Sequence, residues 1–538
     1  MKMLLKQRYL VGKRITSTLT ASCGLPSFSS NSKDYQTLYL VLEACRHSSN
    51  SKTAIETHAR IIKFGYGDYP TLITSLVSTY QRAGCLNHVN RLLGLLCSKH
   101  LDLVAMNIFI ENFMKIGEYK FAKKVFYKMP YRDVITWNSI IGGCVKNACY
   151  EEAFRFFSEM LISNIQPDGF TFASILKASA QLGALSNAQS VHAIMTEKKV
   201  ELNSILNSAL IYTYSKCGSI QIAKEIFSSV PHSDISVWNA MIKGLAIHGL
   251  AMDALLVFSM MERDSVRPDA VTFLGTLTAC NHGGLVEQGR KYFDWMRSRY
   301  SIEPQLEHYG VMVDLYSRAG FLEEAYSTIK AMPIEPDVVT WRTLLSGCKI
   351  YRNQELAEVA IANISDLKSG DYVLLSNIYC SFHRWEYAET VREMMKHKGV
   401  RKNCGKSWIE LAGSIHKFKS GDRSHPEINA VYEVLGSLIK RTRSEGYMPV
   451  TEFVFMDISE EEKEENLSFH SEKLALAYAI LKTSPGEKIS ISKNLRICDD
   501  CHRWIKLVSR VLCRVIVVRD RIRFHQFEGG MCSCGDCW

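Results

Sequence analysis

The sequence predicts two architectures in one chain: an all-α superhelical solenoid of helix–turn–helix repeats, followed by a C-terminal α/β domain that binds zinc. Three observations support this. A nine-residue segment recurs at an offset of 101 residues, amphipathic helical segments alternate with Gly-containing turns through the middle of the chain, and six of the 17 cysteines lie between residues 498 and 537. Paired helices repeating about every 35 residues form solenoids, because each pair buries its apolar face only against its neighbours.

Length and composition fit this division. The chain has 538 residues, which is more than one ordinary domain, and 47% of them are apolar. Its formal charge of +10 and pI near 8.7 favour a polyanionic partner. No run of 18 or more apolar residues occurs, so we expect no membrane span.

The first 34 residues form a basic segment whose first carboxylate is Asp34. Its cations are Lys2, Lys6, Arg8, Lys13, Arg14 and Lys33. Ser and Thr are frequent and no continuous apolar core follows, which predicts an organellar transit peptide rather than a secretory signal. A disordered tail is the alternative. Because Met1–Arg14 could form a basic amphipathic helix, we predict the mitochondrion, with the plastid as the alternative.

The repeats are visible as sequence echoes. Asp133–Ile141 reads DVITWNSII and Asp234–Ile242 reads DISVWNAMI. The same offset relates Gln166–Phe172 to Arg267–Phe273, and a third echo begins at Pro336. Within these long cycles lie shorter ones, each consisting of a helix, a turn with Gly and a second helix. This is the pattern of an α-solenoid.

The C-terminal region contains the ligands of a catalytic zinc. His470 and the Cys498-x-x-Cys501 pair supply three ligands, which leaves a fourth position open for water. Glu472 is not needed as a ligand and could move protons beside that water. Together these residues are typical of a zinc nucleoside or nucleobase deaminase. Taken alone, the Cys-x-x-Cys pair would equally suit a structural zinc knuckle.

Local patterns place these ligands at the starts of helices. A helical run, 474–480, follows His470, and residues 488–492 alternate like a half-buried strand. The two cysteines open a second helix, and residues 515–518 form another strand. The buried stripe of this second helix is predicted to be Trp504, Ile505, Leu507 and Val508. Helix N-termini favour thiolate and hydroxide, so an α-β-α-β order suits the chemistry.

A second set of ligands lies further along the chain. His502, His525, Cys532 and Cys534 complete a tetrahedral set, which predicts a closed structural zinc. The alternative is that Cys532 and Cys534 are merely thiols of the tail. A disulfide between them is less expected in a chain without a secretory signal.

Four motifs carry a family resemblance: Gly421–Pro426, His470–Ala475, Lys493–Cys498 and Cys532–Asp536. At these motifs the chain is similar to plant pentatricopeptide-repeat proteins of the PLS subclass with an E region and a DYW-type cytidine deaminase domain. The resemblance covers Tyr35 to Trp538. It implies sequence-specific binding of single-stranded RNA, and zinc-dependent C-to-U editing of organellar transcripts. Three departures are visible: Ile497 replaces the usual Pro before the Cys-x-x-Cys, Cys404–Trp408 reads CGKSW instead of the usual Gly-Cys-Ser-Trp, and the last three residues of the sequence are Asp536-Cys537-Trp538 instead of Asp-Tyr-Trp.

The resemblance divides the chain into four parts. Residues 1–34 are the transit peptide or disordered tail, and 35–337 hold about nine repeats. Residues 338–403 form the E region of degenerate repeats, and 404–538 form the deaminase domain. Expected cofactors are one catalytic and one structural zinc ion, with no other small-molecule cofactor.

In this family each repeat reads one base with the fifth residue of its first helix and the last residue of the repeat. The predicted pairs are Thr74 with Asp102, Asn107 with Asp133, Asn138 with Asp168, Ser208 with Asp234, and Asn239 with Asp269. Thr or Ser with Asp implies a purine, mainly G, and Asn with Asp implies U, then C, so the element is x-G-U-U-x-G-U followed by two poorly specified positions. Hydrogen bonds to the edge of an unpaired base explain such a code. The Asn residues could instead satisfy turn backbone groups.

Two other functions remain open at this stage. The chain could guide RNA to a deaminase supplied by another protein, although the complete zinc motif argues against this. It could also be an RNA-processing or stability factor, although no paired metal-binding carboxylates are evident. Accessory editing factors are expected as further partners.

Overall fold

The computed structural model describes residues 31–48, 51–67, 69–85, 87–89, 91–92, 103–230, 234–401, 404–411, 414–451 and 460–536. The chain forms two compact units, one of residues 1–149 with 162–165 and the other of residues 150–161 with 166–538. No helix in the described ranges combines the length and hydropathy of a bilayer-spanning segment. Residues 1–30 of the predicted transit peptide and the reading residue Asp102 lie outside the described residues, and residues 31–34 of that segment already belong to helix α2 (Asn31–Ser48).

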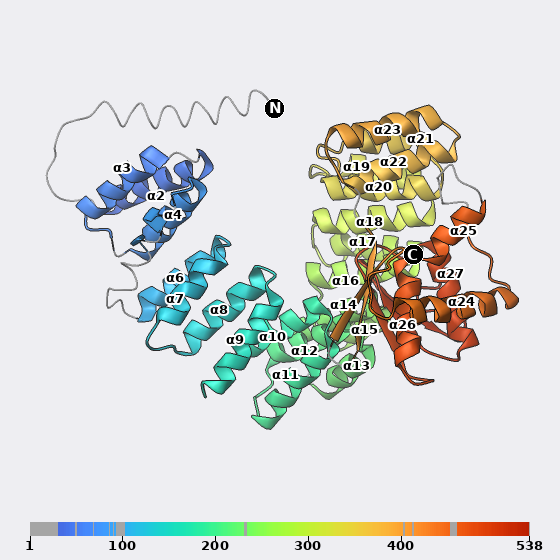
Figure 1. Ribbon diagram of the computed structural model, residues 1–538, viewed down its shortest axis with the longest axis horizontal. Helices are drawn as coiled ribbons and strands as arrows, with labels where there is room; N and C mark the ends of the chain where they lie inside the picture. Colours follow the sequence, from blue (N-terminus) through green and yellow to red (C-terminus); the bar gives the residue numbers. More distant parts are fainter. Residues whose placement is uncertain are drawn as a thin grey trace. The chain divides into compact units, whose positions relative to one another are not determined.

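The first unit consists of helix pairs (Figure 1). Its helices are α2 (Asn31–Ser48), α3 (Ser51–Lys63), α4 (Pro70–Arg82), α6 (Leu103–Lys115), α7 (Tyr119–Lys128) and α8 (Val134–Lys146). The first helices of successive pairs contact each other, α4 lying against α2 and α6, and α6 against α8. In α7 the residues Phe121, Ala122, Val125 and Phe126 are buried, which is the stripe of an amphipathic helix.

The second unit continues the pairs and adds the C-terminal domain. Its repeat helices are α9 (Tyr150–Ile162), α10 (Gly169–Leu182), α11 (Leu185–Glu197), α12 (Ser204–Lys216), α13 (Ile220–Ser229), α14 (Ile235–Ile247), α15 (Ala251–Arg263), α16 (Ala270–Gly283), α17 (Val286–Ser298), α18 (Leu306–Ala319) and α19 (Leu322–Ala331). The first helices stack in sequence from α10 through α12, α14, α16 and α18. The predicted solenoid of helix pairs is therefore confirmed.

The echoed Asp residues begin the first helices. The carboxylate of Asp269 accepts the Thr272 N–H at 2.8 Å, while the Thr272 hydroxyl accepts the Asp269 N–H at 3.1 Å. The same reciprocal box is found at the starts of α8 and α10, at Asp133 and Asp168. Capping satisfies N–H groups that have no partner inside the helix. The recurring Asp-x-x-Thr is thus a helix-start signal, and Asp rather than Asn provides the cap.

Two more helix pairs extend the array, α20 (Val338–Ile350) with α21 (Gln354–Ala362) and α22 (Ser369–Ser381) with α23 (Trp385–His397). Arg342 joins them through a two-pronged ion pair with Asp371, with Nε–Oδ1 and Nη2–Oδ2 distances of 2.8 Å. Asp371 is buried. The charge pair therefore fixes α22 against α20.

The C-terminal domain contains a six-stranded sheet in the order β2-β1-β3-β4-β5-β6. The strands are β1 (Lys406–Leu411), β2 (Ser414–Lys419), β3 (Ile489–Lys493), β4 (Ile516–Arg519), β5 (Phe524–Glu528) and β6 (Met531–Cys532). The helices are α24 (Ile428–Ser444), α25 (Glu460–Ser468), α26 (Ser471–Lys482) and α27 (Asp499–Val511). Only β3 and β4 are parallel, and they are the two strands that the sequence predicted.

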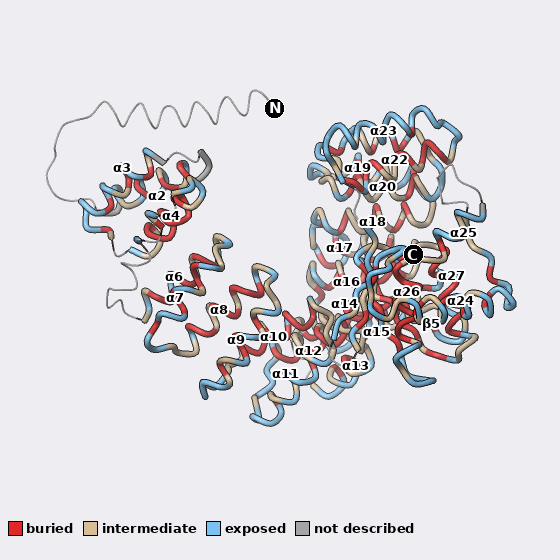
Figure 2. The backbone as a smooth tube through the Cα atoms, viewed as in Figure 1, coloured by how far each residue is buried: buried red, intermediate tan, exposed pale blue. Residues whose placement is uncertain are grey.

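The two faces of this sheet have different neighbours. Ile489, Ile491, Ile516 and Val518 belong to one core with residues of α24, α26 and α27. Side chains alternate along a strand, so the intervening residues face the other way. There Val517 and Phe524 form a small cluster with Ile247 of α14, a repeat helix. The second face is therefore covered in part, around Val517 and Phe524, while Ser490 stays exposed, and Figure 2 shows buried residues in this domain and in the helices beside it.

Polar contacts also join this second face to the repeats. Arg523 Nη1 donates to the carbonyl of His282 in α16 at 2.9 Å, and Lys488 donates to the carbonyl of Gly218 at 3.3 Å. The Phe524 ring stacks on His248, with centroids 4.5 Å apart and planes 3° from parallel. The sheet thus packs on the C-terminal ends of the first helices of several successive repeats.

Candidate metal centres and nucleic-acid groove

The first metal cluster forms at the starts of two helices. His470 precedes α26 and Cys498 precedes α27, so both lie at N-cap positions. The Nδ1 atom of His470 lies 3.4 Å from the Cys498 sulfur and 3.5 Å from the Cys501 sulfur. One ligand atom each from these residues and Glu472 all lie within 4.8 Å of one another. The predicted grouping is therefore present, and its donors fit zinc with one open position.

Glu472 is completely buried beside this cluster. Its Oε1 forms an ion pair with Lys493 Nζ from the end of β3, and its Oε2 accepts the Ser471 hydroxyl at 3.0 Å. Burial by itself raises the pKa of this carboxyl, but the Lys493 ammonium and the His470 ring outweigh it and hold the pKa below its ordinary value. The carboxylate is therefore ionised and fixed in position. Sequence analysis missed Lys493 because a lysine at the end of a strand usually faces solvent.

A second buried ion pair links the two metal-bearing helices. Lys473 of α26 lies 2.8 Å from Asp500 Oδ2 of α27, and Lys473 has no exposed surface. Tyr447 completes the network: its hydroxyl donates to Asp500 Oδ1 at 2.6 Å and accepts from Lys473 at 2.8 Å. Each of the two charged residues directly adjoins a member of the metal cluster. The network therefore sets the spacing of the helix starts.

The second predicted ligand set also comes together. Ligand atoms of His502, His525, Cys532 and Cys534 lie within 4.8 Å of one another, with His502 Nε2 at 3.2 Å from the Cys534 sulfur. These residues come from α27, β5, β6 and the segment after β6. Two imidazoles and two thiols with no position to spare suit a closed tetrahedral zinc site.

Asp520 supports this second cluster from behind. Its Oδ2 lies 3.4 Å from His525 Nε2, the arrangement that orients a metal-binding imidazole. Burial acts to raise the pKa of Asp520, but His525 and nearby N–H groups lower it well below the ordinary value. The same Oδ2 accepts the backbone N–H of Ile497 at 3.4 Å. A proline at residue 497 has no N–H and could not make this bond, so the departure at Ile497 adds a link between the two clusters.

Two of the predicted reading pairs are joined by hydrogen bonds. Asn107 Nδ2 lies 3.4 Å from Asp133 Oδ1, and Asn239 Nδ2 lies 3.2 Å from Asp269 Oδ1. In both pairs the same Oδ1 also accepts the cap bonds of the following helix, from Thr136 and Thr272. In both pairs one carboxylate oxygen, Oδ1, therefore makes both the cap bond and the bond to the paired Asn.

The remaining predicted residues are placed differently. The Thr74 hydroxyl bonds to carbonyls of its own helix at Pro70 and Thr71, and Thr74 is buried. The Ser208 hydroxyl donates to the carbonyl of Ile205 at 3.0 Å, while Asp234 caps α14. Asn138 lies in the second turn of α8, and Asp168 caps α10.

A groove in the second unit contains two of the reading residues. Ser208 and Asn239 line a cavity of about 490 Å³ together with Lys177, Lys243 and Tyr212. The opening is basic and partly aromatic, as single-stranded RNA requires. The predicted residues of these two repeats therefore share one concave surface.

Exposed apolar side chains accompany the reading positions. They occupy the second residue of the first helices: Val104, Ile135, Phe170, Ile205, Val271 and Val339, each at least 55% exposed. Ile205 and Val271 line the groove. Large exposed apolar groups at one recurring position favour contact with flat apolar surfaces such as base faces. These side chains were not predicted from the sequence, although they recur at the same position of the repeated segments.

Comparison with protein-family models assigns regions of the chain. The DYW family of nucleic acid deaminases matches residues 446–538, the E motif 351–410 and the E+ motif 415–441. Pentatricopeptide-repeat models match residues 132–181, 236–266 and 307–334.

Individual proteins show the same similarity. A pentatricopeptide repeat-containing protein of Arabidopsis thaliana is 54% identical over 513 residues, covering 95% of this chain and 96% of that protein. A second from the same plant, named chloroplastic/mitochondrial, is 40% identical and covers 94% of this chain and 77% of that protein. The crystal structure of the maize pentatricopeptide repeat protein PPR10 shares the fold at 17% identity with a TM-score of 0.53, over 87% of this chain and 62% of that one.

Proposed function

This chain belongs to the pentatricopeptide-repeat proteins with E, E+ and DYW-type deaminase regions, and on that premise we propose that it edits organellar RNA by converting specific cytidines to uridines. The observation that carries the proposal is the His470–Cys498–Cys501 cluster with the buried, ionised Glu472 beside it. A chain that only guided another deaminase would have no need to hold a carboxylate in this way. The repeats supply the site specificity.

The reaction consumes cytidine and water and releases uridine and ammonia. Zinc held by His470, Cys498 and Cys501 would supply a water whose pKa is near neutral. Glu472 would accept one proton from this water and deliver it to ring N3 as the oxygen bonds to C4, and would then accept the hydroxyl proton and transfer it to the departing amine. Lys493 keeps Glu472 ionised before each cycle, and Ser471 fixes the rotamer of the carboxylate.

We expect the purified protein to contain two zinc ions per chain, one in each cluster. Cys534→Ser removes a ligand of the second cluster and is expected to lower the content to one, with local unfolding of the tail because metal binding and folding are coupled. His470→Ala should also lower the zinc content to one ion per chain, but without local unfolding of the tail. Elemental analysis combined with hydrogen exchange over β5 and β6 measures both effects. If Cys404→Ser, a control at an exposed thiol, also removes zinc, the assignment is wrong.

The predicted element x-G-U-U-x-G-U ends at the base read by Asn239 and Asp269. Asn239→Ser recreates the Ser–Asp combination and is expected to shift the preference at that position from U to G, roughly tenfold in relative affinity. Binding of RNAs that differ only at this base, measured by fluorescence anisotropy, tests the shift. Asn363→Ser, at an exposed Asn in the E region, should leave both affinities unchanged. Equal losses for both RNAs would mean that Asn239 is structural.

The proposed location is the mitochondrion, with the plastid as the alternative, supported by the basic segment before Asp34. Sequencing of organellar RNA after disruption of the gene tests location and activity together. We expect a cytidine downstream of a G-U-U-x-G-U-like element to lose editing and to regain it with the wild-type chain but not with Glu472→Ala. Full rescue by Glu472→Ala would make the chain a guide for a separate deaminase, and no changed cytidine would exclude editing.

A further inference from the structure

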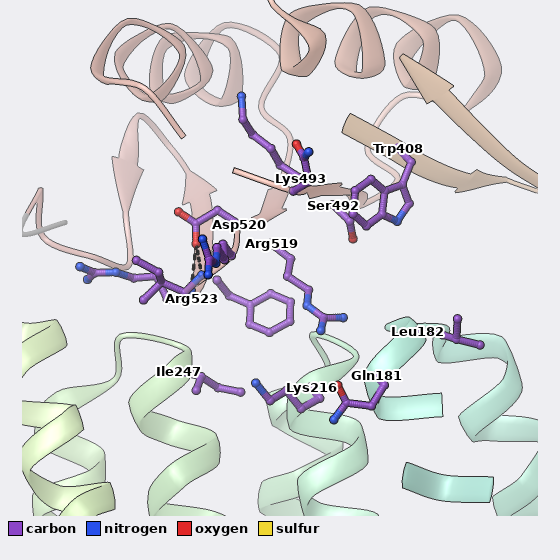
Figure 3. A pocket seen from close by; sticks show the side chains of 14 residues that line it. Gln181, Leu182, Lys216, Ile247, Trp408, Ser492, Lys493, Arg519, Asp520 and Arg523 are labelled. Atoms are coloured by element: carbon purple, nitrogen blue, oxygen red, sulfur yellow. Dashed lines mark hydrogen bonds between the residues drawn. The ribbon is translucent and has the colours of Figure 1, made fainter. Parts of the chain in front are cut away.

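A second cavity lies where the sheet of the C-terminal domain meets the repeats (Figure 3). Its volume is about 230 Å³. Gln181 from α10 and Lys216 from α12 form one wall, and Trp408, Ser492 and Arg519 from the sheet form the other. None of these residues belongs to the metal clusters or to the predicted reading pairs. The cavity is too small for a folded macromolecule but suits a short piece of an extended one.

The three sheet residues form one row across neighbouring strands. Trp408 of β1 pairs in register with Ser492 of β3, and Ser492 pairs with Arg519 of β4. Residues in one row point to the same face, here the face toward the repeats. Lys493, the next residue in β3, points away from the repeat helices in Figure 3, and its Nζ forms an ion pair with Glu472. The cavity and the first metal cluster therefore lie at the same end of β3, on opposite sides of it.

The charge of the cavity is positive and largely uncompensated. Arg519 extends toward Lys216 and Gln181 across the opening (Figure 3). Burial, together with the charges of Arg519 and Lys243, lowers the pKa of Lys216 to about 8. Among the described residues that line the cavity, Asp520 is the single acid, and its carboxylate is bonded to His525 and to the N–H groups of Ile522 and Arg523. An anion placed between these two cations would be stabilised by both of them.

We propose that this cavity binds the sugar–phosphate backbone of the RNA next to the cytidine that is deaminated. Arg519 and Lys216 hold one phosphate between them, and the indole of Trp408 stacks on a base. The strand then passes over the end of β3 to Glu472. The proposal rests on the proposed editing function. It also explains why the sheet packs on the repeats, because the two bodies then hold one strand together.

Binding of two labelled RNAs tests this, with Glu472→Ala present in every protein so that no turnover interferes. One RNA contains only the A-G-U-U-A-G-U element, and the other extends it at the 3′ end by a tail containing the cytidine. We expect the tail to tighten binding, and Arg519→Gln, Lys216→Gln and Trp408→Ala each to weaken the tailed RNA roughly tenfold without affecting the short one. The phosphate variants should also reduce the salt dependence by about one counterion. Arg443→Gln, at an exposed ion pair, is the matched control.

A second measurement does not depend on the predicted element. Oligouridine containing 4-thiouridine should crosslink to the wild-type peptide that carries Trp408, and Lys216→Gln, a change on the repeat side that leaves the sheet intact, should reduce this crosslink.

The site is rejected if the tail adds no affinity and Trp408 is not crosslinked, or if the variants weaken both RNAs equally. These outcomes differ from failure of the editing function. Tail binding that depends on Arg519 without editing by the wild type would retain the site and reject the enzyme. Editing by the wild type that is unaffected by changes at Arg519 or Lys216 would reject the site and retain the enzyme.

Discussion

Glu472→Gln is expected to slow cytidine deamination by about 10²–10⁴-fold while leaving zinc content and RNA affinity unchanged. The amide has the shape of the carboxylate and still accepts the Ser471 hydroxyl, but it cannot take up a proton. The carboxylate lies within 4.8 Å of the three metal ligands and has no exposed surface, so no solvent group can replace it. Single-turnover conversion of cytidine in a tailed RNA, with elemental analysis of the same samples, measures both quantities.

The matched control is Glu461→Gln, which removes an equal charge from the exposed face of α25. It should leave the rate within a factor of two. If Glu472→Gln kept a rate within tenfold of the wild type, another group would carry the proton and the mechanism proposed above would be wrong. If Glu472→Gln lost zinc, its effect would be on metal binding instead.

Lys473→Met is expected to cost about 3–5 kcal/mol of local stability, because it leaves Asp500 buried without its cation. Tyr447 still donates to Asp500, but one hydroxyl does not replace an ammonium. The chain has two units, so a single unfolding midpoint would mix them. Native-state hydrogen exchange of amides in α26 and α27 isolates the opening of these helices.

Two further variants serve as controls for this hydrogen-exchange measurement. Lys482→Met removes a lysine whose side chain is 39% exposed and pairs with Glu427, and should leave the exchange of the α26 amides nearly unchanged. The double change Lys473→Met with Asp500→Leu should recover part of the loss, because it removes both buried charges. If Lys473→Met cost no more than Lys482→Met, the buried network would not hold the two helices together.

Much of the solenoid could be predicted because its signals are local. The echoes at Asp133 and Asp234 are helix caps, and a cap is specified within four residues. The strands at residues 489–493 and 516–519 were likewise visible from apolar alternation. The hairpin of β1 and β2 was not, because the polar and apolar residues of Lys406–Lys419 do not alternate strictly, and the hairpin gains its place only by pairing with β3 across more than 70 residues.

The metal ligands could be predicted because spacing and residue type identify them. Their supporting charges could not. Charged residues at the start of a helix or the end of a strand are usually exposed to solvent. The folded domain shows instead that Lys473, Lys493 and Asp500 are buried. The polar residues Ser490 and Ser492 similarly gave β3 the pattern of a strand with one face in water. In the folded chain repeat helices cover the part of that face near Ser492, while Ser490 stays exposed, and a pattern along one strand does not reveal this.

The contact of the sheet with α12, α14 and α16 limits how new specificities can arise. Repeats added before α10 would lengthen the RNA element at its 5′ end and leave this contact unchanged. Repeats inserted between α12 and α16 would separate Gly218 from His282, and the domain could no longer reach both. The number of nucleotides between the RNA element and the edited base would then stay the same among related proteins. New RNA specificities would arise by the addition of repeats at the N-terminal end and by substitution of the reading residues.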